Sequence, residues 1–318
     1  MFYPCMIQAP EHCPLCNGQT LSHREAFHTY DLWRCAGCQG MFWWPFQNPG
    51  AEWYQNDSRY HGRNQDPLLD PVDTHQLFLQ EKEQERGTLL DVGCGTGNFL
   101  AAAQKTGYRV SGIDFDPDAV RVAREIFHLE DVHVGDVDQL SMAHKTYNKV
   151  TFFEVLEHLD QPNAFLKSVK GLLSPGGCIA LSVPDAEAWH PFQLHDKPPR
   201  HLTRWTKEAL RLFLQRHGFQ VVRIVQKPVT LQQLITKFHF WTQSYLSFNL
   251  VSRVRQTQVS SQGSRPAGIP SRSVVWAKRL AKMKDWMLFF FPAVAVWMYL
   301  QLAHKHSSGL YVFAKRVD

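Results

Sequence analysis

Short apolar runs alternate with amphipathic stretches along most of the chain from Thr88 onwards. Buried parallel strands are apolar on both faces and the helices that cover them are apolar on one, so this alternation is typical of a parallel α/β sheet. We expect strands at 88–93, 109–114, 132–136, 148–154, 177–183 and 219–226, and a final strand at 309–315. Helices are expected at 73–84, 97–106, 117–127, 161–173 and 206–217.

The chain divides into parts of different character and shows no internal repeat. The expected parts are a cysteine-containing ribbon at 1–48, a linker with lid helices at 49–86, an α/β core at 87–226, an insertion at 227–308 and the last strand of the core at 309–318. Within the insertion, a stretch rich in Ser, Gly and Pro at 256–273 favours a flexible loop.

Composition places the chain among globular proteins, with 44% hydrophobic and 20% charged residues. Its net charge of +5 is unevenly distributed: residues 253–318 carry eleven Lys and Arg against two acids, or +9, which leaves −4 on the rest. A basic block on a slightly acidic body indicates that this part of the chain contacts an anionic surface. It disfavours nucleic acid as a partner of the whole protein. The first residues lack the basic and apolar regions of a signal peptide, so we expect a cytoplasmic protein.

Four cysteines near the N-terminus form two close pairs, Cys13 with Cys16 and Cys35 with Cys38, with eighteen residues between the pairs. Each C-x2-C pair can form a tight turn that offers two thiolates, and two such turns complete a tetrahedral zinc site. Four thiolates leave no open coordination position, so the predicted Zn²⁺ is structural. The alternative, four unrelated free cysteines, leaves the regular spacing unexplained.

A turn with three glycines follows the first expected strand of the core, directly after Asp91. The glycines are Gly93, Gly95 and Gly97. Glycines let a ligand approach the backbone, and the helix that begins there presents free N–H groups. The next two strands end in Asp114 and Asp136, which we expect near the turn because the carboxyl ends of parallel strands share one edge of the sheet. Dinucleotide-binding domains use a similar turn, but with the spacing G-x-G-x-x-G.

Four segments in order, LLDVGCGTG, GIDFDPDAV, GDV and FFEVLEHLDQP, resemble the motifs of class I S-adenosylmethionine (SAM)-dependent methyltransferases. The resemblance covers residues 88–226 and implies a Rossmann-like sheet of seven strands. It also implies that Asp91 faces the cofactor ammonium, that Asp114 holds the ribose and that Asp136 lies beside adenine. The glycines Gly93, Gly95 and Gly97 would surround the methionine part, and Glu154 would support binding. The alternative, a Rossmann-like domain whose glycines only form a turn, does not explain the carboxylates at successive strand ends.

The segment FFEVLEHLDQP looks most like ubiquinone-pathway O-methyltransferases and polysaccharide-cluster methyltransferases. Resemblance to the quinone enzymes implies that Glu154, Glu157 and His158 are candidate Mg²⁺ ligands. Oxygen ligands suit this hard cation, whereas an imidazole is less typical of it. The alternative is that Glu154 supports cofactor binding while Glu157 and His158 cap the following helix.

Methyl transfer to an oxygen needs a base, because the acceptor must lose its proton. The candidates are His158, His195 and His201, and His190 lies in the same loop as His195. The segment HLTRWT, which begins at His201, resembles an H-L-x-x-[FW]-[ST] stretch of these methyltransferases. For each histidine the alternative is a surface position without a catalytic role.

An uncharged apolar run, Trp286–Ala303, lies within the insertion and contains Pro292. Upstream cations and interfacial Trp and Tyr favour an element that lies on the cytoplasmic leaflet of a membrane. The cations are Lys278, Arg279, Lys282 and Lys284. Two alternatives are open: a true span, for which the run is barely long enough, and a helix buried in its own domain or in a dimer.

The sequence therefore predicts a SAM-dependent methyltransferase with a zinc ribbon and a helical, apolar insertion, peripheral on the inner membrane. The favoured acceptor is amphiphilic: a lipid-linked sugar or polysaccharide precursor, or a prenylated phenol. Three alternatives are an rRNA methyltransferase, a methyltransferase of soluble nucleotide-sugars and an inactive SAM-binding scaffold. The identity of the acceptor and the oligomeric state are left open.

Overall fold

The chain forms two compact units, one large and one small. The computed structural model describes residues 9–55, 58–65, 67, 72–81, 86–141, 145–187, 197–231, 233–235, 238, 272–303 and 307–317. The large unit comprises Met1–Glu187, Leu194–Lys227 and Gly309–Asp318, and the small unit comprises Ala188–Gln193 and Pro228–Ser308.

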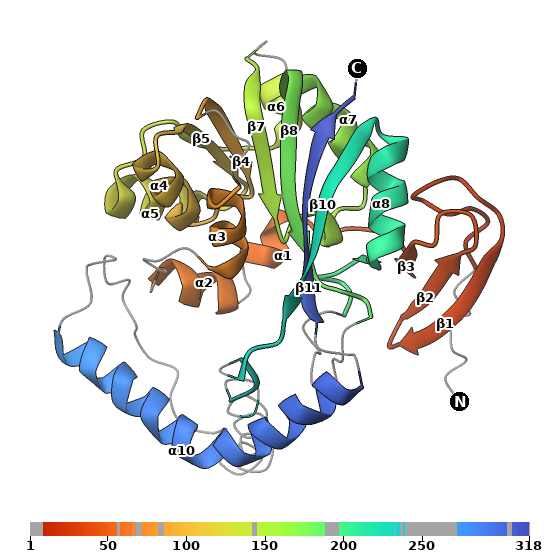
Figure 1. The fold of residues 1–318 in the computed structure, drawn as a ribbon. Coiled ribbons are helices and arrows are strands. Elements are labelled where there is room, and N and C mark those ends of the chain that lie inside the picture. Colours follow the sequence, from red (N-terminus) through yellow and green to blue (C-terminus); the bar gives the residue numbers. More distant parts are fainter. Residues whose placement is uncertain are drawn as a thin grey trace. The chain divides into compact units, whose positions relative to one another are not determined.

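A sheet of seven strands forms the centre of the large unit (Figure 1). Its strands are β4 (Thr88–Val92), β5 (Arg109–Asp114), β6 (Val132–Val134), β7 (Tyr147–Phe153), β8 (Leu173–Val183), β10 (Phe219–Pro228) and β11 (Ser307–Arg316). They lie in the order β10-β11-β8-β7-β4-β5-β6. The strands from β8 to β6 pair in parallel, whereas β11 pairs antiparallel with β8. This mixed sheet confirms the predicted class I methyltransferase fold.

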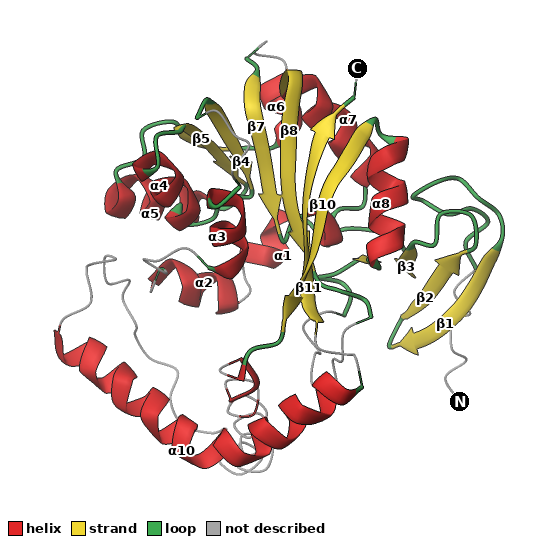
Figure 2. Cartoon of the chain, viewed as in Figure 1, coloured by secondary structure: helices red, strands yellow, loops and turns green. Residues whose placement is uncertain are grey.

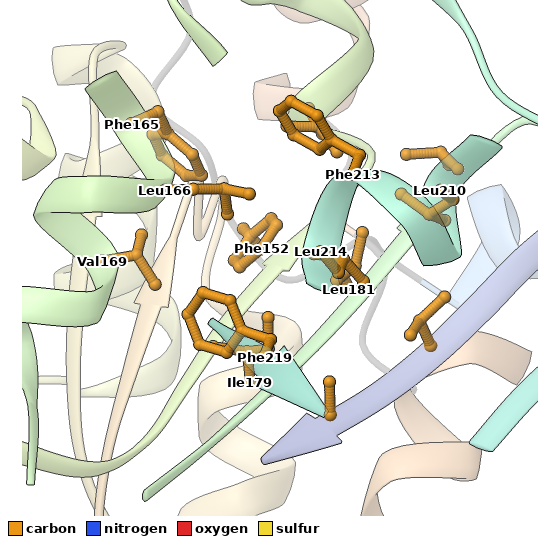
Figure 3. Close-up of a cluster of buried hydrophobic side chains, with 14 of the residues drawn as sticks. Phe152, Phe165, Leu166, Val169, Ile179, Leu181, Leu210, Phe213, Leu214 and Phe219 are labelled. Atoms are coloured by element: carbon orange, nitrogen blue, oxygen red, sulfur yellow. The ribbon is translucent and has the colours of Figure 1, made fainter. Parts of the chain in front are cut away.

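Side chains alternate between the two faces of this sheet, and helices cover both (Figure 2). In β11, Val312 joins one cluster of buried side chains and Phe313 joins the other. Figure 3 shows the first cluster, in which side chains of α7 (Pro162–Leu172) and α8 (Lys207–Arg216) pack on the sheet. Helices α4 (Asn98–Lys105) and α5 (Pro117–Phe127) supply Phe99 and Val120 to the second. Burial on both faces explains why the strands are almost continuous apolar runs.

The observed elements differ from the predicted ones mainly at their ends. Strand β8 begins four residues earlier than the expected 177, and β6 stops at Val134. The helix expected at 73–84 is α3 (Asp73–Leu79), and residues 82–85 lie outside the described part. The short helices α1 (Ala51–Gln55) and α2 (Ser58–Gln65) lie in the expected lid segment, and α6 (Val137–Ser141) follows β6.

The cysteine-containing ribbon contributes three strands to a second, four-stranded sheet. These are β1 (Leu21–Phe27), β2 (Tyr30–Cys35) and β3 (Met41–Trp44), and the fourth is β9 (Thr203–Arg204) from the core. The two residues of β9 pair antiparallel with Met41 and Phe42. Leu15 and Phe42 also belong to the same buried cluster as Phe165 and Leu166 of α7. The ribbon therefore shares both a sheet and a hydrophobic core with the rest of the large unit.

The small unit contains α10 (Arg272–Leu302), a helix of 31 residues with Pro292 inside it. Ala293 and Leu300 on this helix are buried together with Leu234 and Ile235. The expected apolar run lies in the C-terminal part of α10. Of the expected loop at 256–273, only the last two residues are described, at the start of α10. Among the described helices, none combines the length and the apolarity needed to cross a membrane.

Candidate active site

The turn between β4 and α4 has the backbone geometry that its glycines suggest. Gly93, Gly95 and Gly97 all have positive φ, of 74°, 53° and 85°. A Cβ at Gly97 would also lie 2.9 Å from Cβ of Ala123 in α5, closer than such atoms approach. Gly97 is the N-cap of α4, whose first N–H groups have no acceptor inside the helix. The turn thus brings backbone donors to the carboxyl edge of the sheet.

Asp91 lies at the end of β4 and is buried, with 4% of its surface exposed. Its Oδ1 accepts a hydrogen bond of 2.7 Å from Oγ1 of Thr151 in β7. Burial raises the pKa of Asp91 to about 8; the hydrogen bond from Thr151 lowers this pKa in part, and the nearby charge of Asp114 raises it. A carboxyl group in this environment favours ionisation only when a cation lies beside it.

Asp114 ends β5 and is buried beside the same turn. Its Oδ2 accepts a hydrogen bond of 2.7 Å from the N–H of Gly95, and its Oδ1 accepts one of 2.9 Å from the N–H of Asp116. Burial raises the pKa of Asp114, although the two N–H donors and the charge of Arg63 act in the opposite direction. Asp114 therefore lies where the sequence analysis expects it.

Asp136 follows β6 and is exposed. Its Oδ1 accepts hydrogen bonds of 3.1 Å from the N–H of Asp138 and 3.0 Å from the N–H of Gln139, at the start of α6. The side chain thus fixes the loop after the third strand of the predicted core. Its role beside adenine stays a prediction.

Helix α2 adds two polar side chains to the cofactor side that the sequence analysis does not identify. The guanidinium carbon of Arg63 lies 3.6 Å from the place that a Cβ at Gly95 would occupy. Asn64 Nδ2 donates a hydrogen bond of 2.7 Å to Oδ2 of Asp116. No motif or periodicity in this short helix marks either residue, so only the structure reveals them.

A second group of side chains consists of Glu157, His158 and His201, whose potential ligand atoms all lie within 4.8 Å of one another. Glu157 and His158 lie in the 3₁₀ turn η1 (Leu156–His158) after β7. Nε2 of His158 is 3.9 Å from Oε1 of Glu157, and the two imidazole rings are 4.7 Å apart at an angle of 83°. The structure therefore brings together two of the three predicted histidines, although 43 positions separate them in the sequence.

The tautomer of His158 is set by its surroundings. Nδ1 lies 2.8 Å from the carbonyl oxygen of Arg200, which can only accept, so Nδ1 carries the proton and Nε2 carries the lone pair. Burial lowers the pKa of His158 to about 4. The ring is therefore neutral near pH 7, with an acceptor nitrogen beside Glu157.

Residues of the lid segment enclose this group. Tyr54 Oη donates a hydrogen bond of 3.3 Å to the carbonyl oxygen of Arg200, and its ring lies 5.8 Å from that of His158. Asn48 Nδ2 donates a hydrogen bond of 2.7 Å to the carbonyl oxygen of His158. The Arg200 guanidinium lies 5.6 Å from the centre of the Trp53 ring. Apart from the aromatic content of the segment, no pattern in the sequence predicts these contacts.

Glu154 is not among the residues whose potential ligand atoms lie within 4.8 Å of one another, although its charge is close enough to raise the pKa of His158. It has a positive φ of 55°, and Oε1 accepts hydrogen bonds from Ser182 Oγ (2.7 Å) and Lys227 Nζ (3.4 Å). The predicted ligand set of Glu154, Glu157 and His158 stays a prediction; the described residues whose potential ligand atoms lie close together here are Glu157, His158 and His201. The N-cap residue of α7 is Gln161, whose side chain makes no cap hydrogen bond, and the alternative in which Glu157 and His158 cap this helix stays a prediction. His190 and His195 lie outside the described residues.

The four ribbon cysteines form one compact cluster. Their Sγ atoms are separated by 3.7 Å between Cys13 and Cys38 and by 3.5 Å between Cys16 and Cys35, and all four lie within 4.8 Å of one another. Tetrahedral Zn²⁺ with Zn–S bonds of about 2.3 Å places its sulfur atoms about 3.8 Å apart. A hydrogen bond from the Cys13 thiol lowers the pKa of Cys38 to about 5. The donor set and its spacing thus fit this metal.

Comparison with known sequences assigns the family. The sequence model described as "Methyltransferase domain" matches residues 62–224, slightly more than half of the chain. The chain belongs to the methyltransferase domain family. The matched region contains the glycine turn, the carboxylates at the strand ends and the Glu157–His158–His201 cluster.

Curated relatives cover part of the chain. A ubiquinone biosynthesis O-methyltransferase of Xanthomonas axonopodis pv. citri is 30% identical over 174 residues, which are 52% of this chain and 65% of the relative. The mitochondrial ubiquinone biosynthesis O-methyltransferase of Schizosaccharomyces pombe is 33% identical over 116 residues, 33% of this chain and 42% of the relative. The chain thus spans less than two thirds of the length of these relatives.

Two solved methyltransferase structures match most of the chain at low identity. A SAM-dependent methyltransferase from Archaeoglobus fulgidus is 16% identical, with a TM-score of 0.45 over 76% of this chain and 94% of that one. A SAM-dependent methyltransferase from Mesorhizobium loti is also 16% identical, with a TM-score of 0.48 over 78% of this chain and 100% of that one.

Proposed function

We propose that this protein is a SAM-dependent methyltransferase that methylates an oxygen atom of an amphiphilic acceptor. The observation that carries the proposal is the pair of buried carboxylates, Asp91 and Asp114, beside a turn of three positive-φ glycines. Family membership supports methyl transfer, and the name of the Xanthomonas relative supports oxygen as the methylated atom.

The residues on the cofactor side fit the groups of SAM. When bound, the cofactor supplies a methyl group that its sulfonium has already activated. Asp91 would pair with the ammonium group, because a buried carboxyl with a raised pKa gains most from a cation. Asp114 would hold the ribose hydroxyls, and Asp136 would approach adenine. The glycine turn would leave space for the methionine part.

On the acceptor side we assign the base to His158. Its Nε2 lone pair is available because Nδ1 donates to the carbonyl oxygen of Arg200. A neutral imidazole within hydrogen-bonding reach can take the proton of an acceptor hydroxyl, which contributes on the order of 10²–10⁴ to a rate. His201 stands next to it and is the second candidate, while His195 stays an untested prediction.

The same cluster offers a different use, as a site for a divalent cation. Glu157, His158 and His201 provide one carboxylate and two imidazoles, a set that suits a transition metal such as Mn²⁺ better than Mg²⁺. Nε2 of His158 cannot serve as base and ligand at once. Titration with Mn²⁺, followed by electron paramagnetic resonance, distinguishes the two uses. Binding that His201→Gln abolishes and Glu154→Gln preserves would support the cation site, whereas no binding by the unmodified protein would support His158 as the base. Tight Mn²⁺ binding that is lost in Glu154→Gln but kept in His201→Gln would support the ligand set predicted from the sequence.

We assign a structural Zn²⁺ to the four-cysteine cluster. The support is the fit of the Sγ separations to a tetrahedral site and the absence of an open position in a four-thiolate set. When bound, zinc would stabilise the fold of the ribbon. Elemental analysis of freshly purified protein should give one zinc per chain, and a value near zero would remove the assignment.

We further propose that α10 binds an anionic membrane surface. Met287, Phe291 and Leu302 are 72%, 79% and 81% exposed, and their spacing puts them on one side of the helix. Four cations lie upstream in the same helix, at 278–284. Apolar side chains beside a basic segment are typical of helices that lie in a membrane interface. This location supports an acceptor that is itself amphiphilic, such as a lipid-linked sugar or a prenylated phenol.

Transfer from SAM with a tritiated methyl group tests the acceptor class. The full-length protein should label a membrane lipid extract and should leave ribosomal RNA and soluble nucleotide-sugars unlabelled. Labelling of RNA would support the rRNA alternative, and labelling of nucleotide-sugars the soluble alternative. Binding of S-adenosylhomocysteine (SAH) without labelling of any extract would support an inactive scaffold. Asp114→Asn serves as the control with a weakened cofactor site.

A further inference from the structure

The segment that carries His201 lies between the ribbon and the turn that carries His158. The N–H of Leu202 donates a hydrogen bond of 2.7 Å to the carbonyl oxygen of Glu157. On the other side, the N–H of Trp43 in β3 donates a hydrogen bond of 2.8 Å to the carbonyl oxygen of Leu202. One residue next to His201 therefore connects the ribbon sheet directly to the histidine cluster.

The cysteine cluster lies close to this connection along the chain. Strand β3 begins three residues after Cys38, and the N–H of Cys35 donates a hydrogen bond of 3.0 Å to the carbonyl oxygen of Gly40. The other cysteine pair also contacts the core, since Asn163 Nδ2 of α7 donates a hydrogen bond of 2.8 Å to the carbonyl oxygen of Pro14. Both cysteine-containing turns are thus attached to neighbouring elements, one to the start of β3 and the other to α7.

Charged side chains add a second connection between the ribbon and this segment. Glu25 of β1 forms ion pairs with Lys197 and with Arg204, the latter at 3.5 Å. The Lys197 ammonium also lies 4.9 Å from the centre of the Trp43 ring. The two cations flank the stretch whose Arg200 carbonyl oxygen accepts the hydrogen bond from His158.

We propose that the ribbon is a positioning element for the acceptor side of the active site. With its metal bound, it fixes residues 200–204 and so keeps His158 and His201 in their mutual geometry. The proposal rests on the proposed function in that it takes the bound metal to be Zn²⁺ and the histidine cluster to face the acceptor. The cofactor side should depend less on the ribbon, because Asp91 and Asp114 lie on strands that pair within the seven-stranded sheet and share only part of their buried core with the ribbon.

Hydrogen exchange of the zinc-loaded, full-length protein tests this proposal without an acceptor. Exchange is followed by mass spectrometry in peptides that contain Leu202 and Trp43, while SAH binding is measured by calorimetry. Removal of zinc with a chelator should speed exchange in both peptides more than tenfold and change SAH affinity less than twofold. Faster exchange at Leu202 is expected because its N–H donates to Glu157 only while β9 is held by β3.

Two variants of the ribbon, each with one carboxylate replaced by an amide, provide a test and a matched control, and both retain the four cysteines. Glu25→Gln removes both ion pairs and should speed exchange of the Leu202 peptide about two- to fivefold, a modest effect since these pairs are partly exposed to solvent. Asp31→Asn removes an exposed pair with His23 at 3.0 Å within the ribbon and should leave this exchange unchanged. Both variants should retain their zinc and their SAH affinity.

Either of two results would overturn the proposal. Unchanged exchange at Leu202 after zinc removal would mean that the core holds this segment alone. Parallel loss of SAH binding would mean that the ribbon stabilises the whole fold rather than one side of the site. Failure of methyl transfer on every acceptor tested would contradict the proposed function instead. The hydrogen-exchange result would still test the role of the ribbon, because it does not depend on activity.

Discussion

Asp91→Asn offers a direct test of the cofactor site, because the raised pKa of this carboxyl couples SAH binding to a proton. With a pKa of about 8, roughly nine in ten Asp91 side chains are protonated at pH 7 in the cofactor-free protein. Pairing with the ammonium group of SAH requires the ionised form. Binding at pH 7 should therefore release close to one proton, and affinity should rise roughly tenfold per pH unit between pH 6 and pH 7 and level off above about 8.

Calorimetry in two buffers with different ionisation enthalpies measures the released proton. Asp91→Asn keeps an oxygen to accept the hydrogen bond from Thr151 but cannot ionise, so its affinity should be independent of pH and its proton release zero. Thr151→Val removes the bond that lowers the pKa of Asp91, and should shift the rise in affinity to higher pH. Wild-type binding that releases no proton and is flat from pH 6 to 8 would refute the pairing of Asp91 with the ammonium.

The same raised pKa affects the stability of the cofactor-free protein. The unfolded chain loses this proton near pH 3.8, whereas the folded chain retains it to about pH 8. The contribution to stability is thus complete below pH 3.8 and is lost as the pH rises towards 8. In thermal melts recorded at a series of pH values, Asp91→Asn should remove this contribution to the fall of the melting temperature with rising pH.

Three further predictions concern other parts of the molecule. Asp114→Asn replaces a charge-assisted contact by a neutral one and should weaken SAH binding by about 1–2 kcal/mol, roughly five- to thirtyfold. The control Asp131→Asn, just before β6, should leave calorimetric affinity unchanged. His158→Gln should lower the turnover of the acceptor found by labelling by about 10²–10⁴ with unchanged SAH affinity, and wild-type turnover would exclude it as base. Phe291→Glu should weaken pelleting with anionic vesicles at least tenfold, since burying a phenylalanine contributes about 2 kcal/mol; wild-type pelleting would show that this face does not enter the lipid.

The core and the cofactor side could be predicted because their signals are local. Strands buried on both faces must be apolar along their whole length, and the glycine turn directly precedes a helix. Asp91 and Asp114 end neighbouring strands, and parallel strands end at one edge, so their proximity follows from topology. The four cysteines were predictable for a similar reason, since each pair is a single turn of the chain.

The acceptor side could not be predicted as fully, because it depends on contacts between distant segments. A strand of two residues such as β9 has no periodicity, so its pairing with β3 leaves no trace in the hydrophobic pattern. The proximity of His201 to Glu157 and His158 is likewise a contact between distant segments. Glu154 and Glu157 are near each other in sequence, but the positive φ of Glu154 directs its side chain to Ser182 and Lys227.

The two sides of the site are therefore held by different physical means, and variants in them should have different consequences. Asp91 and Asp114 are buried in a sheet whose pairing does not involve the ribbon, so changes there act on cofactor affinity. His158 and His201 are positioned by backbone hydrogen bonds that pass through Leu202 to the ribbon, so changes in the ribbon act on the geometry in which the acceptor reacts. Transfer of the sulfonium-activated methyl group to an acceptor depends chiefly on alignment, so a small displacement of these residues is costly. The zinc proposed for the ribbon would therefore act on the alignment of the acceptor rather than on cofactor binding.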